Sequence, residues 1–169
     1  MKQLKLLKAT LLAAVLLLLQ PMARGQVQDS VDVLDYDVTL DLSAEAPFGG
    51  RTLVTARLLR PCDGFRLYLR GTADSVFVNG NRLAEPSLNP VPLQGIATGE
   101  TFTVEVFYHC NGYVENYGWG GVHFDSDMSF NLGVGFETNP HVLGRVMMPC
   151  RDNFQDKATY TLRIKSKSG

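Results

Sequence analysis

The feature that most constrains the fold is an alternation of apolar and polar residues at a period of two. In residues 35–42, which read DYDVTLDL, Tyr36, Val38 and Leu40 share one face and the acidic residues share the other. Such alternation indicates β-strands that are buried on one face and solvated on the other. The same period recurs over residues 52–58, 65–70, 75–83, 101–108, 128–134 and 158–165. We therefore predict an all-β fold, an antiparallel β-sandwich.

The alternation also predicts which side chains face the core. In residues 101–108 the inward set begins with Phe102 and Val104, and in the last stretch it is Tyr160, Leu162 and Ile164. The stretch over 128–134 is expected to turn Met128, Phe130, Leu132 and Val134 inward. Asn79-Gly80 is expected to form a tight hairpin turn, because both positions of such a turn need a positive φ.

The first 25 residues have the order of a secretory signal peptide. Three lysines precede an apolar run from Ala9 to Leu19, and small residues at Ala23 and Gly25 follow it. The run is short of the about 20 residues that a membrane span needs, although a retained anchor is the alternative. We expect residues 1–25 to be the signal peptide, residues 26–169 to be one β-sandwich domain without a membrane span, and the protein to be exported to the periplasm, the cell surface or the medium.

The charge balance disfavours nucleic acid as a partner. Residues 1–25 hold four of the 16 basic residues and none of the 17 acidic ones, so the remaining chain is acidic. A nucleic-acid surface would need a basic patch, and the chain has no basic run before its short RIKSK tail.

The chain has three cysteines, and export would permit a disulfide. Cys62 and Cys110 each stand beside turn residues where an apolar run stops, so they form the candidate pair, with Cys150 as a buried thiol. The alternative is that all three are unpaired, since a bridge requires Cα atoms within about 7 Å.

Taken alone, the residues point to no catalytic centre and no metal site. His109 and Cys110 are adjacent, so on a strand they point to opposite faces and cannot share a metal ion. The sequence has no His-Glu-x-x-His motif, and a thiol in apolar surroundings such as Cys150 is inert. We expect no catalytic residue and no metal ligand in this chain.

One loop could bind a ligand. Tyr113, Tyr117 and Trp119 are interleaved with glycines, a composition suited to stacking on a sugar face or a protein surface. A secreted β-sandwich module that binds carbohydrate or protein is therefore an alternative function. Aromatic residues that only cover the end of a sheet would give the same composition.

The stretch GRVMMPCRDNFQDKATYTLRI resembles the end of the N-terminal domain of zinc aminopeptidases of the aminopeptidase N family, and with the upstream strands the resemblance spans about residues 33–165. The matching signature, to which we assign a structural role, is Arg145, Pro149, Cys150, Asp152 and Lys157, followed by a strand that begins Ala-Thr-Tyr. The family often has an aromatic pair before Pro-Cys, where this chain has Met147 and Met148.

The resemblance implies a β-sandwich that precedes a zinc-binding catalytic domain, which this chain lacks. It implies that the parent protein is a metallopeptidase that removes N-terminal residues from peptides, with the catalytic domain and its peptide substrates as partners. In the family, a Gln or Glu upstream of the arginine anchors the substrate's α-amine, and Glu137 is the candidate here. A stand-alone interaction domain derived from such a peptidase is a further alternative.

Overall fold

The computed structural model describes residues 29–44, 46–125, 128–139, 141–154 and 157–166. The predicted signal peptide, residues 1–25, lies outside the described residues. Within the described part, no helix has the length and apolar character needed to cross a membrane.

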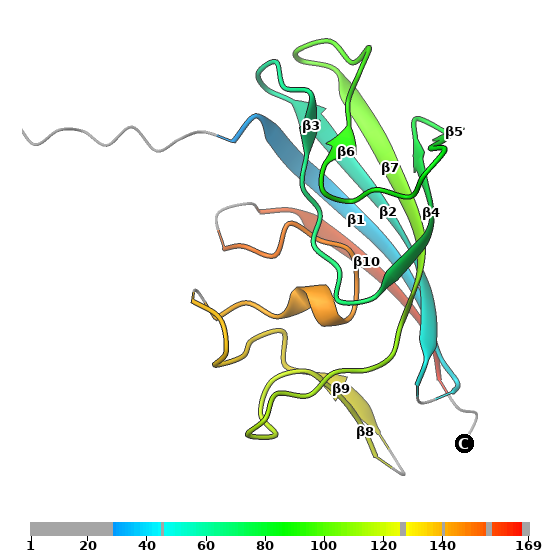
Figure 1. Ribbon diagram of the computed structural model, residues 1–169, viewed down its shortest axis with the longest axis vertical. Coiled ribbons are helices and arrows are strands. Elements are labelled where there is room, and N and C mark those ends of the chain that lie inside the picture. The colour runs from blue at the N-terminus through cyan, green and yellow to red at the C-terminus, as the bar shows by residue number, and fades with distance from the viewer. Residues whose placement is uncertain (1–28, 45, 126–127, 140, 155–156, 167–169) are drawn as a thin grey trace, which may run out of the picture.

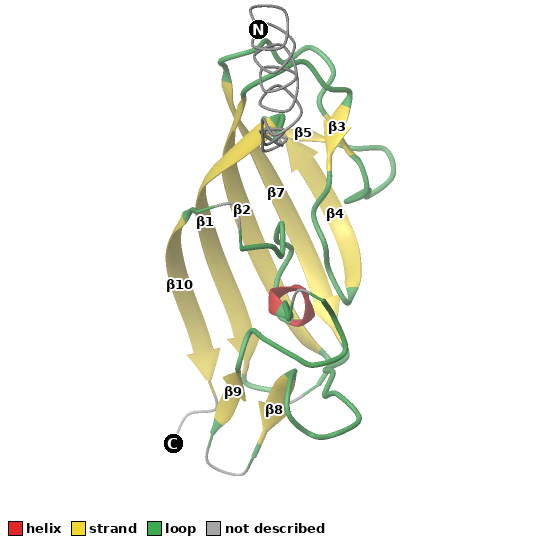
Figure 2. Cartoon of the chain, turned by 90° about the vertical axis from the view of Figure 1, so that its left-hand side faces the viewer, coloured by secondary structure: helices red, strands yellow, loops and turns green. Residues whose placement is uncertain are grey.

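A six-stranded sheet forms one layer of the fold, with strand order β10-β1-β2-β7-β4-β5 (Figure 2). Its strands are β1 (Val31–Leu42), β2 (Phe48–Leu58), β4 (Thr72–Val78), β5 (Asn81–Arg82), β7 (Thr101–Cys110) and β10 (Thr159–Ser166). All neighbouring pairs are antiparallel except β1 and β10, which run parallel. The predicted hairpin is present, with positive φ at Asn79 and Gly80 between β4 and β5.

Short elements and loops form the second layer over one face of this sheet (Figure 1). They are the ribbon of β3 (Gly64–Phe65) and β6 (Val91–Pro92), the 3₁₀ helix η1 (Gly144–Val146), and the hairpin of β8 (Val122–Phe124) and β9 (Ser129–Asn131). The core lies between the layers, where Val38, Val54 and Val104 are completely buried. The predicted all-β, antiparallel β-sandwich class is confirmed, with the parallel β1–β10 pair as its one departure.

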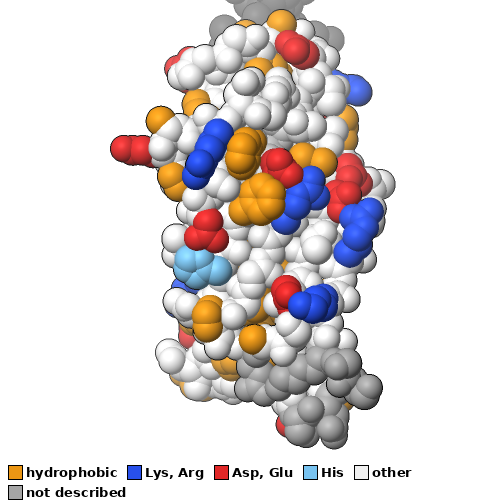
Figure 3. Space-filling view, turned by 90° about the vertical axis from the view of Figure 1, so that its right-hand side faces the viewer, with side chains coloured by type: hydrophobic (Ala, Val, Ile, Leu, Met, Phe, Trp, Pro, Cys, Tyr) orange, Lys and Arg blue, Asp and Glu red, His pale blue; other side chains and the backbone are white. Residues whose placement is uncertain are grey.

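The opposite face of the sheet carries charged pairs between neighbouring strands. Arg51 Nε donates to Glu105 Oε1 at 2.5 Å across β2 and β7, and Lys165 Nζ donates to Asp41 Oδ2 at 2.8 Å across β10 and β1. Basic and acidic side chains lie in contact on this face in Figure 3. This face is solvated, as the polar half of the alternation predicts.

The prediction that the last strand is buried on one face was wrong. Tyr160, Leu162 and Ile164 of β10 lie in register with Tyr36, Val38 and Leu40 of β1, on the core side of the sheet. They are nevertheless 53%, 56% and 51% exposed, because the second layer does not extend over the edge strand β10 (Figure 2). We call these three side chains the uncovered face of β10.

The inward placement of residues 128–134 was also wrong. Only Ser129–Asn131 of this stretch forms a strand, paired with β8 alone and not with the main sheet. All four of the side chains expected inside are exposed: Met128, Phe130, Leu132 and Val134. Similarly, residues 65–70 do not form a full strand: Phe65 is the last residue of β3, and Tyr68 makes one isolated bridge.

The structure has no Cys62–Cys110 disulfide, so that expectation was wrong, and all three cysteines are unpaired. Cys110 lies opposite Phe48, the first residue of β2, in the β2–β7 strand pair. Cys62 lies near the other end of β2, four residues after its last residue, Leu58. Eleven residues of strand, at about 3.3 Å each, place the two ends roughly 30 Å apart.

We predict that the three thiols react at very different rates. Burial raises the pKa of the Cys110 thiol to about 11 and that of Cys150 to about 12, so little thiolate forms at neutral pH, whereas Cys62 is half-buried. Titration of the native domain with a thiol reagent should modify Cys62 first, and the other two only in denaturant. Equal rates for all three would contradict this burial.

Candidate functional site

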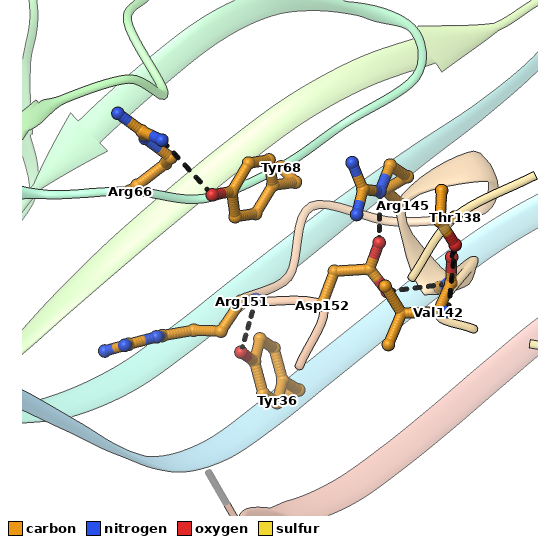
Figure 4. A network of polar contacts seen from close by, with 9 residues as sticks. Tyr36, Arg66, Tyr68, Thr138, Val142, Arg145, Arg151 and Asp152 are labelled. Carbon is orange, nitrogen blue, oxygen red and sulfur yellow. Dashed lines mark hydrogen bonds and ion pairs between the residues drawn. The ribbon is translucent and has the colours of Figure 1, made fainter. Parts of the chain in front are cut away.

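The aspartate of the signature closes the turn that carries the other signature residues. Asp152 has a positive φ of 49°, a conformation that aspartate tolerates better than most residues. Its Oδ1 accepts the Gly144 N–H at 2.9 Å, and its other oxygen pairs with the Arg145 guanidinium (Figure 4). The Asp152 side chain is only 4% exposed, so one buried carboxylate joins the start of η1 to the chain that leaves it.

The signature segment is fixed to both layers of the fold. Cys150 and Tyr68 exchange backbone hydrogen bonds of 3.1 and 2.7 Å, and the Arg145 guanidinium lies 4.8 Å from the centroid of the Tyr68 ring. On the sheet side, the Arg151 N–H donates to the Tyr36 hydroxyl at 3.1 Å (Figure 4). The Arg151 side chain donates to the Val31 carbonyl at 2.8 Å.

The remaining signature residues differ in burial. Pro149 and Cys150 are buried, and Lys157 is exposed just before β10. Burial is also the main cause of the high pKa of the Cys150 thiol, so little of it is thiolate at neutral pH. These contacts give the segment a structural role.

Glu137, the candidate amine anchor, is exposed but held in place. The Tyr113 hydroxyl donates to Glu137 Oε2, and the Asn116 N–H donates to Oε1 at 3.2 Å. The hydrogen bond to Glu137 is the main reason that the pKa of Tyr113 is raised, and the Arg70 guanidinium, 3.6 Å from the centroid of the Tyr113 ring, acts in the opposite direction. The structure thus brings Glu137 to the aromatic loop that the sequence suggested as a separate binding feature.

Glu115 is a functional candidate that the sequence reasoning missed. Its side chain is 3% exposed, and its carboxylate accepts three backbone N–H groups, from Gly120, Phe136 and Glu137, at 3.2, 3.0 and 2.9 Å. The N–H of Glu137 is the largest cause that holds the pKa of Glu115 below its usual range. The available signal was an acidic residue inside a loop of glycines and aromatics.

A cluster of three aromatic rings lies near the carboxylates of Glu115 and Glu137. Trp119 and Phe136 have ring centroids 5.8 Å apart, and Phe136 contacts His141 edge-on at 5.6 Å. Trp119 and Phe136 are 51% and 61% exposed. Carboxylates next to exposed rings can bind a cation that has an apolar substituent.

A cavity of about 160 Å³ lies between the signature turn and the sheet edge. Its walls include Tyr36, Tyr160, Met148, Asp152 and Phe154. Tyr36 and Tyr160 stack at 5.0 Å, so the cavity adjoins the uncovered face of β10. It has the size of one large apolar side chain.

The described residues contain no group of three or more His, Cys, Asp or Glu side chains that could hold a metal ion. His109, which the sequence analysis rejected as a ligand, instead contacts Asp74 Oδ1 through Nδ1 at 2.8 Å on the solvated face of the sheet. The donor set in this part of the chain therefore does not fit a zinc ion.

Comparison by sequence finds no matching family model and no matching curated protein. Comparison by structure finds zinc peptidases. The M1 zinc metallopeptidase of Deinococcus radiodurans is 24% identical, with a TM-score of 0.66 over 82% of this chain and 33% of that chain. Aminopeptidase A of Legionella pneumophila, in complex with aspartic acid, is 20% identical (TM-score 0.61, 80% and 16% covered). Yeast LTA4 hydrolase is 18% identical (TM-score 0.55, 81% and 23% covered).

These likenesses establish the fold. The chain has the architecture of the N-terminal β-domain of M1 zinc metallopeptidases, and the resemblance that the signature predicted is confirmed at this level. The chain spans a third or less of the length of the solved structures that it matches.

Proposed function

We propose that this chain, which has the fold of the M1 N-terminal β-domain, is the non-catalytic N-terminal domain of an exported zinc aminopeptidase. The observation that carries the proposal is the agreement of two independent features. The fold matches that domain over 82% of the chain. The sequence signature lies in a turn closed by Asp152, and the neighbouring residues Cys150 and Arg151 bond to Tyr68 and Tyr36 in the two layers. Zinc would be bound by the domain that follows, because the described residues here offer no metal-ligand set.

The uncovered face of β10 supports the presence of such a following domain. Isolated soluble domains rarely leave a row of large apolar side chains on the core side of a sheet without cover. Here Tyr160, Leu162 and Ile164 are each more than half exposed, and the cavity beside Tyr160 could receive one further side chain. We propose that the catalytic domain packs on this face.

Glu137 is proposed as the anchor for the α-amine of the peptide substrate. A protonated amine in a partly dry site needs an anionic partner. The two donors, Tyr113 and Asn116, orient the Glu137 carboxylate while leaving it exposed, so lone pairs remain for an incoming ammonium group.

The test uses the longer protein, by which we mean this domain together with the proposed catalytic domain. We expect that protein to hydrolyse aminoacyl-anilides, a chelator to abolish the activity, and residues 26–169 alone to be inactive. Glu137→Gln should raise KM more than it lowers kcat, with Glu100→Gln, in a distant exposed turn, as the matched control. Absence of zinc-dependent activity in the longer protein would refute the proposal.

The exposed pair Trp119 and Phe136 favours one second candidate, a secreted module that binds carbohydrate or protein. Binding on a glycan array by the isolated domain, lost on Trp119→Ala, would identify this function. It would do so whether or not the longer protein has peptidase activity.

A further inference from the structure

We propose that Glu115 is a positioning residue, which fixes the backbone at Phe136 and Glu137 and thereby aims the Glu137 carboxylate. The inference rests on the proposed function for the role of Glu137 in binding an amine. The positioning itself follows from contacts within this chain and can be tested without any enzymatic activity.

The Glu115 carboxylate forms hydrogen bonds with the backbone of two loops. One carboxylate oxygen, Oε1, accepts the Glu137 N–H at 2.9 Å, and the other, Oε2, accepts the N–H groups of Phe136 and Gly120 at 3.0 and 3.2 Å. The donors thus come from Glu115's own loop and from the loop that carries the anchor. The Asn116 N–H next to it donates directly to Glu137, so the same loop holds both the backbone and the side chain of the anchor.

The arrangement requires a carboxylate rather than an amide. Both oxygens of Glu115 act as acceptors, and in glutamine one of these positions becomes an NH₂ donor facing another N–H. A buried donor that loses its acceptor is destabilised, so the backbone of residues 136–137 would move away.

Two glycines make room for this carboxylate. A Cβ at Gly135 would collide with Glu115 Oε1, and a Cβ at Gly120 would lie 2.9 Å from Glu115 Cδ. Because the side chain is buried and three N–H groups hold it, the carboxylate can move away from an added Cβ only by breaking these hydrogen bonds. Gly135→Ala therefore offers a way to displace the carboxylate while keeping its charge.

Tyr113 supplies a reporter of the position of Glu137. Its pKa is raised chiefly by its hydrogen bond to Glu137, with smaller effects of the same sign from burial and Glu115, and it is lowered by Arg70. Glu137→Gln removes the negative charge that accepts from the Tyr113 hydroxyl, so it should lower the Tyr113 pKa, and this variant sets the reference value. The measurement is a pH titration of ¹³Cζ-labelled tyrosine by NMR, assigned with Tyr113→Phe.

We expect Glu115→Gln to lower the Tyr113 pKa most of the way to the reference value, together with loss of exchange protection at the amides of Phe136 and Glu137. Gly135→Ala should do the same with Glu115 intact, and Glu100→Gln should leave the titration unchanged. If Glu115→Gln does not fold, Gly135→Ala carries the test alone. An unchanged Tyr113 pKa in a folded variant would overturn the proposal.

In the longer protein, Glu115→Gln should raise KM about tenfold, the scale of a lost hydrogen bond to a charged group, with kcat nearly unchanged. If the titration changes but the longer protein has no peptidase activity, the positioning stands and the proposed function fails. If the activity is present but KM and the titration both stay constant, the positioning fails.

Discussion

Replacing Asp152 with alanine should lower the free energy of unfolding by about 2 to 3 kcal/mol, the upper range for hydrogen bonds to a charged group. Three losses combine at this position. The Gly144 N–H loses its acceptor, Arg145 loses its counter-ion beneath the surface, and alanine must adopt a positive φ. Urea denaturation of the isolated domain, followed by circular dichroism, measures the change.

Asp152→Asn is the matched control. Asparagine tolerates the same backbone conformation and keeps an acceptor for the Gly144 N–H, whereas the charge and the acceptor that face Arg145 are lost. We expect less than half of the alanine effect. Asp41→Ala, which removes an exposed pair with Lys165, should have almost none. Equal losses for Asp152→Ala and Asp152→Asn would show that the ion pair alone stabilises the turn.

If the proposed catalytic domain packs on the uncovered face of β10, introducing Leu162→Asp and Ile164→Asp together should separate it from this domain. In the isolated chain both side chains are already more than half exposed, so we expect a loss of about 1 kcal/mol or less for each, the range of strand propensities. In the longer protein the same substitutions would place two charges in an apolar interface. Aminopeptidase activity should then fall at least about tenfold, with earlier thermal unfolding.

The control for this surface lies on the same strand. Arg163→Ser and Lys165→Ser alter the opposite, solvated face of β10, where the side chains pair with Asp37 and Asp41. They should leave both activity and domain association intact. A large loss of stability from the two aspartates in the isolated chain would mean that the face is covered from within the domain.

The sheet was predictable because each of its central strands has one solvated face and one buried face. Val38 and Val104 are buried as the alternation requires, and Asn79-Gly80 turns as its composition demands. The same pattern misplaced Leu162, because alternation reports that a face is apolar without reporting what covers it. The cover of an edge strand is decided by elements far away in the sequence, or outside the chain.

The candidate site was predictable only in part. The signature and Glu137 were found because the order of residue types along one segment resembles that of a known family, and such an order is visible in the local sequence. Glu115 was missed because its role arises from three N–H groups, two of which lie more than 20 residues further along the chain. Such convergence is set by loop geometry, for which a single sequence has no periodic signal.

The parallel pairing of β10 with β1 has a consequence for biosynthesis. Asp35 and Thr159, which face each other in this pair, are 124 residues apart. At typical rates of translation, of roughly 10 residues per second, β10 is synthesised on the order of 10 s after β1, so the outer edge of β1 stays unpaired for that time. During that time its unpaired N–H and C=O groups can template aggregation, so early termination before residue 159 should yield insoluble product.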